Sequence, residues 1–163
     1  NADQNMAVGM LVPETSAYFR QEDVFSHVED SGHEHWRWRM YMAEKIAMQL
    51  DPAQFKVKAL YVMGSTKNST AQAGSDIDLL VNFFGSPAQK RYLMNWFQGW
   101  SLALDEINYL RTGYKAGGLL DVHFIDDEGI ERYRNSLTRY DISSDCCKEL
   151  PLIEKETEPG KGT

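Results

Sequence analysis

The spacing of apolar residues predicts two long helices and a shorter one. In residues 32–50 apolar side chains recur every three or four positions, as on the buried face of a helix: Trp36, Met40, Ala43, Ala47 and Leu50. Residues 88–111 show this spacing over a longer stretch: Leu93, Trp96, Phe97, Trp100, Leu104, Ile107 and Leu110. Ser31 and Glu34 form the capping box that is typical of a helix start. Residues 126–139 predict the third helix, with one shared face: Ile130, Tyr133 and Leu137.

Short segments rich in branched and aromatic residues lie between these helices and predict three strands. They cover residues 57–63, 76–84 and 119–125, so the predicted domain spans residues 31–140. Residues 1–30 lack sustained periodicity, and we expect an N-terminal arm or linker there. Residues 141–163 carry charge, Pro and Gly with little to bury, and we expect this tail to be disordered.

Two carboxylates at the start of the second predicted strand carry the first chemical signal. Because side chains alternate along a strand, Asp76 and Asp78 leave the same face of the sheet. Like charges held side by side repel, and a divalent cation is their natural counter-charge. A pair of solvated carboxylates at a strand start is the plain alternative. Asp121, in an otherwise apolar strand, favours the metal site, because a carboxylate there is costly unless it is paired or bound to metal.

A glycine at the end of the first predicted strand supplies a second signal. Gly64-Ser65 directly follows this strand, and a glycine at such a position lets the backbone approach a ligand closely. Backbone amides at this point can receive phosphate oxygens. The sequence therefore predicts a phosphate-binding turn beside a metal site.

This arrangement resembles the nucleotidyltransferase domain of the DNA polymerase β-like superfamily. The shared pattern is a strand, Gly-Ser, a loop, Asp-apolar-Asp-apolar, and a third carboxylate on a later strand. In minimal members of the superfamily the loop commonly reads GSxARGxAxxxSDIDLLV, and this chain reads GSTKNSTAQAGSDIDLLV. The positions in step are Ala71, Ser75, Asp76, Ile77 and Asp78, whereas Asn68 and Ser69 replace the usual Arg-Gly.

The resemblance implies a fold and a reaction. The implied fold is α/β (α+β), a short mixed twisted sheet with helices packed mainly on one face. The implied reaction moves a nucleoside monophosphate from an NTP, with ATP the expected donor, to an acceptor hydroxyl of a protein or small molecule. Pyrophosphate is released, and two Mg²⁺ ions, or Mn²⁺ in their place, assist the transfer.

The resemblance also implies roles for individual residues. Three carboxylates serve as catalytic groups and metal ligands: Asp76, Asp78 and Asp121. Four residues contact the nucleotide: Gly64, Ser65, Lys67 and Ser75. Lys67 is expected to supply positive charge in place of the missing arginine.

Other interpretations of the same residues stay open. The Asn68-Ser69 replacement favours a catalytically silent nucleotide-sensing or partner-binding module, similar to an antitoxin. A metal-dependent phosphohydrolase would use the same carboxylates. His123 shares a face with Asp121, and it either contacts substrate, accepts a proton, or serves as a structural histidine. A zinc site is the least favoured use of a loose histidine cluster: His27, His33 and His35.

Composition narrows the partners and the compartment. Seventeen basic and twenty-four acidic residues give a net charge of −7, and no basic stripe is visible, which disfavours long nucleic acid as a substrate. The two cysteines are adjacent and suggest no disulfide framework, so a reducing, cytoplasmic setting is expected. No apolar run approaches the length of a membrane span.

The chain begins with Asn, and residues 100–124 are similar to nucleotidyltransferase domains fused to phosphoenolpyruvate synthase/pyruvate phosphate dikinase-like proteins. We therefore expect a domain of a larger protein.

Overall fold

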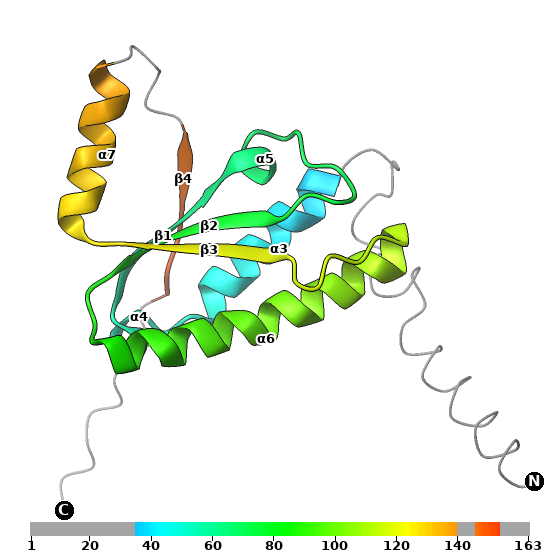
Figure 1. The fold of residues 1–163 in the computed structure, drawn as a ribbon, viewed down its shortest axis with the longest axis horizontal. Helices are drawn as coiled ribbons and strands as arrows, with labels where there is room; N and C mark the ends of the chain where they lie inside the picture. Colours follow the sequence, from blue (N-terminus) through cyan, green and yellow to red (C-terminus); the bar gives the residue numbers. More distant parts are fainter. Residues whose placement is uncertain (1–34, 140–145, 154–163) are drawn as a thin grey trace, which may run out of the picture. The chain divides into compact units, whose positions relative to one another are not determined.

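The described residues build a four-stranded sheet with helices on both faces (Figure 1). The computed structural model describes residues 35–139 and 146–153, all within one compact unit, Glu34–Thr163. The helices are α3 (His35–Gln49), α4 (Pro52–Phe55), α5 (Gly64–Lys67), α6 (Pro87–Thr112) and α7 (Asp127–Arg139). The strands are β1 (Val57–Met63), β2 (Ile77–Phe83), β3 (Leu120–Ile125) and β4 (Cys147–Leu150). No helix in these residues is long and apolar enough to cross a membrane.

The sheet is mixed, with the strand order β3-β2-β1-β4. Strand β1 runs antiparallel to both β2 and β4, whereas β2 and β3 are parallel. A parallel pair needs a long crossover connection, and the 26-residue helix α6 provides it. The expected α/β (α+β) class with a short mixed sheet is thereby confirmed.

The two faces of the sheet differ in burial. On one face, alternate residues of β1 and β2 are fully buried: Leu60, Val62, Leu79 and Val81. This core is shared with apolar residues of α3 and α6, such as Ile46 and Leu93. The opposite face is only partly covered, with α7 as its helical cover, and Asp78 and Leu80 on it are half-buried. The carboxylates therefore stand on the more open face.

Helix α6 has strong signals at both ends. Ser86 accepts a hydrogen bond from the Gln89 amide, and the Gln89 side chain accepts one from the Ser86 amide. Pro87 occupies the first turn, where its missing N–H costs nothing. Gly113 ends the helix with a φ of 76°, a left-handed conformation that glycine adopts without strain. The boundaries predicted from sequence for this helix are confirmed to within one residue.

The buried face of α6 is more polar than the periodicity predicted. Leu110 is 53% exposed, while three polar side chains on the helix are buried: Ser101, Asp105 and Asn108. Ser101 Oγ accepts from the Leu120 amide, and the Asp105 carboxylate accepts from the amides of Ala116 and Gly117. These bonds attach the segment that enters β3 to the helix. Apolar spacing alone could not reveal them.

The predicted disorder of residues 141–163 is wrong for residues 147–150. These residues form β4, which pairs with β1 and places Leu150, 1% exposed, opposite Leu60. Without β4, β1 would be an edge strand with unpaired backbone groups. Four residues with one buried apolar side chain are too few for a periodic pattern to be detected.

Some predicted features lie outside the described residues. They are the arm 1–30, the capping box at Ser31 and Glu34, and His27 and His33.

Replacing Leu79 by alanine tests the core. Leu79 is fully buried in the central strand β2, so Leu79→Ala is expected to lower the free energy of unfolding by about 2–5 kcal/mol. Leu102→Ala, at a 50% exposed position on α6, is the matched control and should change it by less than about 0.5 kcal/mol. Denaturant unfolding monitored by circular dichroism measures both. Equal losses would mean that the core is placed wrongly.

Candidate functional site

The parallel pairing of β2 and β3 brings two carboxylates together. Asp78 lies directly opposite Asp121 in the register of the two strands. Asp121 Oδ2 lies 3.1 Å from Nε2 of His123, which is two residues along the same strand. Ligand atoms of Asp78, Asp121 and His123 all lie within 4.8 Å of one another. Groups this close can share one cation.

The electrostatics extend this group to Asp76. Burial raises the pKa of Asp78, and repulsion from Asp121 and Asp76 raises it further, while His123 opposes the shift. Burial likewise raises the pKa of Asp76, and repulsion from Asp121 adds to the effect. Asp76 is an exposed residue directly before β2. We call Asp76, Asp78 and Asp121, together with His123, the carboxylate site.

Asp121 and His123 are more exposed than their apolar neighbours suggested. Their side chains are 51% and 52% exposed, and they form a pair with each other. The desolvation cost expected for a buried Asp121 is therefore reduced. His123 takes part in the carboxylate site and is not a histidine enclosed in the core. Its half-exposed ring is open to a ligand on this face of the sheet.

Gly64 fits closely against the carboxylate site. It begins α5 with a φ of 64°, a conformation that disfavours any residue with a Cβ. A Cβ at this position would also collide with the Asp78 carboxylate, and would lie 3.2 Å from Cγ of Asp78. Ser65 follows and is half-buried. The predicted Gly-Ser turn thus lies beside Asp78, although its contact with phosphate remains a prediction.

The loop between α5 and β2 places the other two predicted nucleotide contacts. The Ser75 hydroxyl accepts a hydrogen bond from the Gln72 amide at 2.8 Å, so this side chain holds the loop itself. Lys67 lies on α5 close enough to Cys147 for its charge to oppose the raised pKa of that thiol. Its side chain is therefore near β4. The nucleotide contacts of Ser75 and Lys67 therefore stay predictions.

Ser69 occupies an unusual backbone conformation. Its φ is 61°, in the left-handed region that favours glycine. This is the position at which the resembling sequences carry glycine. The replacement of Gly by Ser has therefore left the loop in a conformation that glycine would adopt freely. Asn68 and Ser69 thus differ from the common motif in their side chains, whereas the backbone at Ser69 keeps a left-handed conformation.

Sequence reasoning missed a buried arginine that holds the loop before Asp76. Arg39 is fully buried and donates to the carbonyls of Ser75 at 3.0 Å and Ala73 at 3.1 Å, and to Oδ1 of Asn108 at 3.0 Å. Asn108 also donates to the Ala73 carbonyl at 2.9 Å. Burial and, to a lesser extent, the nearby Arg111 lower the pKa of Arg39 to about 10, against the opposing effect of Asp76. The available signal was its position four residues before Ala43, within the buried stripe of α3.

Alanine at Gly64 tests the contact with Asp78. Gly64→Ala and Gly113→Ala both place a Cβ at a positive φ, which costs about 1–2 kcal/mol. Only Gly64→Ala also drives a Cβ into a side chain, since nothing lies within 4 Å of a Cβ at Gly113. Gly64→Ala should therefore lose at least about 1 kcal/mol more stability than the control. Equal losses in urea unfolding would argue against the close approach of Gly64 and Asp78.

A sequence model of the family described as nucleotidyltransferase domain matches residues 43–132, more than half of the chain. The matched segment runs from α3 into α7 and contains the whole carboxylate site and Gly64. It ends before β4. No curated protein and no solved structure gives a significant match.

Proposed function

The chain belongs to the nucleotidyltransferase domain family, and we propose that it is a Mg²⁺-dependent nucleotidyltransferase. It transfers a nucleoside monophosphate from an NTP, ATP being the expected donor, to an acceptor hydroxyl of a protein or small molecule. Pyrophosphate is the second product. The observation that carries the proposal is the convergence of Asp78, Asp121 and His123 within 4.8 Å, beside Gly64.

The residues present fit a hard divalent cation. Carboxylate oxygens are the donors that Mg²⁺ prefers. Burial raises the pKa of Asp76 and Asp78, and repulsion among the carboxylates raises it further, so a counter-charge would favour their ionised forms. Asp76, Asp78 and Asp121 would hold the metal. The imidazole of His123 is a softer donor than a carboxylate and is less suited to Mg²⁺. When bound, the cation neutralises phosphate charge and lowers the pKa of the acceptor hydroxyl.

The protein groups around this site would position the reactants. The Gly64 amide and the Ser65 hydroxyl receive the outgoing phosphates, and Lys67 adds positive charge from α5. The acceptor oxygen attacks the α-phosphorus while the bond from that phosphorus to the pyrophosphate oxygen breaks. The proton of the acceptor hydroxyl passes to Asp121, which the neighbouring His123 supports at 3.1 Å.

The rival interpretations predict different observations. A phosphohydrolase built on the same carboxylates would release inorganic phosphate, whereas a transferase releases pyrophosphate. A silent nucleotide-sensing module would bind NTP without turnover. Ser69 keeps the left-handed φ suited to the glycine of the common motif, so the backbone at this position gives no argument for a silent module.

Neutralising one carboxylate tests the proposal. Asp78→Asn removes a metal-binding charge with little change of shape, so it should lower Mg²⁺-dependent pyrophosphate release from NTP by more than about a hundredfold. Glu128→Gln, an equivalent change at an exposed position of α7, is the matched control and should retain full activity. Release is measured with each of the four NTPs, with and without Mg²⁺, and labelled nucleotide in the same samples detects self-modification.

The results separate the alternatives. Inorganic phosphate as the product would contradict the transferase and support the hydrolase. Full activity of Asp78→Asn would remove the carboxylate site from the reaction. If no product forms, calorimetric titration with NTP decides the case. Tight Mg²⁺-dependent binding that Asp78→Asn abolishes would indicate a site that needs its acceptor, and absence of binding would contradict the proposal.

A further inference from the structure

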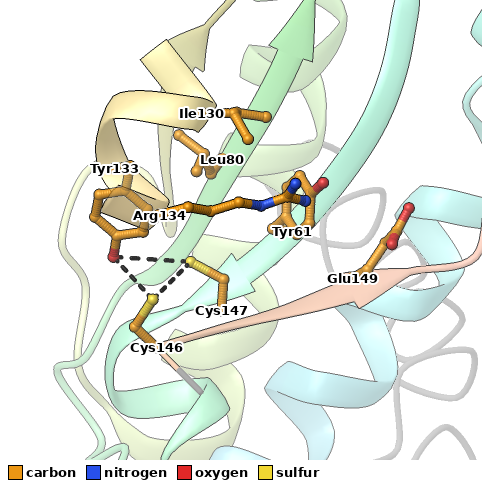
Figure 2. A pocket seen from close by; sticks show the side chains of 8 residues that line it. All are labelled: Tyr61, Leu80, Ile130, Tyr133, Arg134, Cys146, Cys147 and Glu149. Carbon is orange, nitrogen blue, oxygen red and sulfur yellow. Dashed lines mark hydrogen bonds between the residues drawn. The ribbon is translucent and has the colours of Figure 1, made fainter. Parts of the chain in front are cut away.

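A pocket of about 250 Å³ opens on the same face of the sheet as the carboxylate site (Figure 2). Its floor is formed by Tyr61 and Leu80, which are paired neighbours on β1 and β2. Leu80 follows Asp78 by two residues, about 7 Å along the strand, and its other neighbour is His123 on β3. The floor of the pocket therefore begins about 7 Å along β2 from Asp78.

The walls of the pocket suit a flat ring. Ile130 and Tyr133 of α7 face the floor, so apolar and aromatic surfaces lie on both sides. The Arg134 side chain extends across the pocket to the Tyr61 ring, as Figure 2 shows. Glu149 lies opposite Tyr61 on β4 and forms the far rim. Nucleotide bases stack on aromatic rings and on arginine, and every base can do so because each has a flat π-face.

The charged groups of the pocket supply the two kinds of polar contact that a base edge needs. Arg134 can only donate hydrogen bonds, and the Glu149 carboxylate accepts them. Arginine pairs well with acceptors such as the N7 and O6 atoms of guanine, and a carboxylate pairs with an exocyclic amine. Both charges act on Tyr61: burial raises its pKa, Glu149 raises it further, and Arg134 opposes the shift. They therefore lie close enough to engage one small ligand.

We propose that this pocket receives the purine base of the NTP whose phosphates lie at the carboxylate site. The inference rests on the proposed function and adds a base preference to it. A purine presents acceptors and, in ATP and GTP alike, an exocyclic group to Arg134 and Glu149, and its two rings offer more stacking surface than a pyrimidine. The molecule that receives the nucleoside monophosphate is a weaker choice of occupant for this pocket. Its expected base, Asp121, lies on the β3 side of Asp78, whereas the pocket lies on the β1 and β4 side.

The pocket is a feature of this chain beyond the family core. The family match ends at residue 132, whereas Tyr133, Arg134 and Glu149 follow it, as do Cys146 and Cys147 at the edge of the pocket. Base recognition by these residues would thus be added to a common catalytic core. The matched segment supplies only the floor and Ile130.

The two cysteines of the chain provide a direct readout. Both line the pocket, 3.5 Å apart, so the rate at which a chromogenic disulfide reagent modifies them reports whether the pocket is occupied. Burial raises the pKa of Cys147 to about 11, so all rates are compared at one pH above neutral. With Mg²⁺, ATP or GTP should slow the reaction at least about fivefold, which corresponds to about 80% occupancy. Tripolyphosphate, CTP and UTP should slow it by less than about twofold at equal concentration.

Variants of α7 test the contact separately. Arg134→Gln should weaken purine NTP binding by about tenfold or more in calorimetry, because it removes a charged hydrogen-bond donor. Its binding of tripolyphosphate should stay within about twofold of the original. Arg132→Gln, on the same helix but outside the pocket, is the matched control and should bind both ligands normally.

Each outcome bears on one proposal or the other. Equal protection by tripolyphosphate, equal protection by pyrimidine nucleotides, or no protection at all would overturn the base pocket. Mg²⁺-dependent binding of tripolyphosphate that Asp78→Asn abolishes would still support the carboxylate site in those cases. If the unmutated protein did not bind tripolyphosphate in the presence of Mg²⁺, the result would count against the proposed function as well.

Discussion

The candidate site is organised around two like charges, Asp78 and Asp121, that the sheet holds side by side. The parallel pairing of β2 and β3 fixes the two residues opposite each other, and helix α6 is the crossover that makes such pairing feasible. Strand β1, which precedes β2 and runs antiparallel to it, ends opposite Asp78 and places Gly64 against the Asp78 carboxylate. A protein gains no stability from like charges held together. A counter-charge relieves this repulsion, and the divalent cation that we propose would supply it beyond what His123 provides.

Buried polar groups hold this arrangement in place. Arg39 and Asn108 bind the backbone of the loop that precedes Asp76, and Asp105 binds the loop that leads to β3. Because these side chains are buried, each lost partner would leave a desolvated polar group, at a cost of about 1–3 kcal/mol. The loops on either side of the carboxylates are thus fixed from the face of the sheet that α3 and α6 cover. The open face is left available for ligands.

The sequence predicts the framework better than the details of the site. Helical and strand periodicity predicted α3, α6, α7 and the first three strands. The sequence also singled out Asp78 and Asp121, which the structure brings together. Strand β4 escaped detection, because its four residues bury one apolar side chain and its pairing with β1 is a long-range contact. Arg39 was missed because the search was for an apolar stripe. The proposed base pocket combines residues of four elements that are distant in sequence. Such combinations depend on tertiary packing, which local pattern does not encode.

Direct observation of a bound cation tests the central claim most closely. Mn²⁺ can be titrated into the protein alone, and electron paramagnetic resonance reports the free ion. The account predicts saturable binding that weakens by more than about tenfold in Asp78→Asn and in Asp121→Asn, and that is unchanged in Glu128→Gln. Equal Mn²⁺ affinity in all four proteins would contradict it, because the carboxylates that β2 and β3 hold together would then not be the metal site.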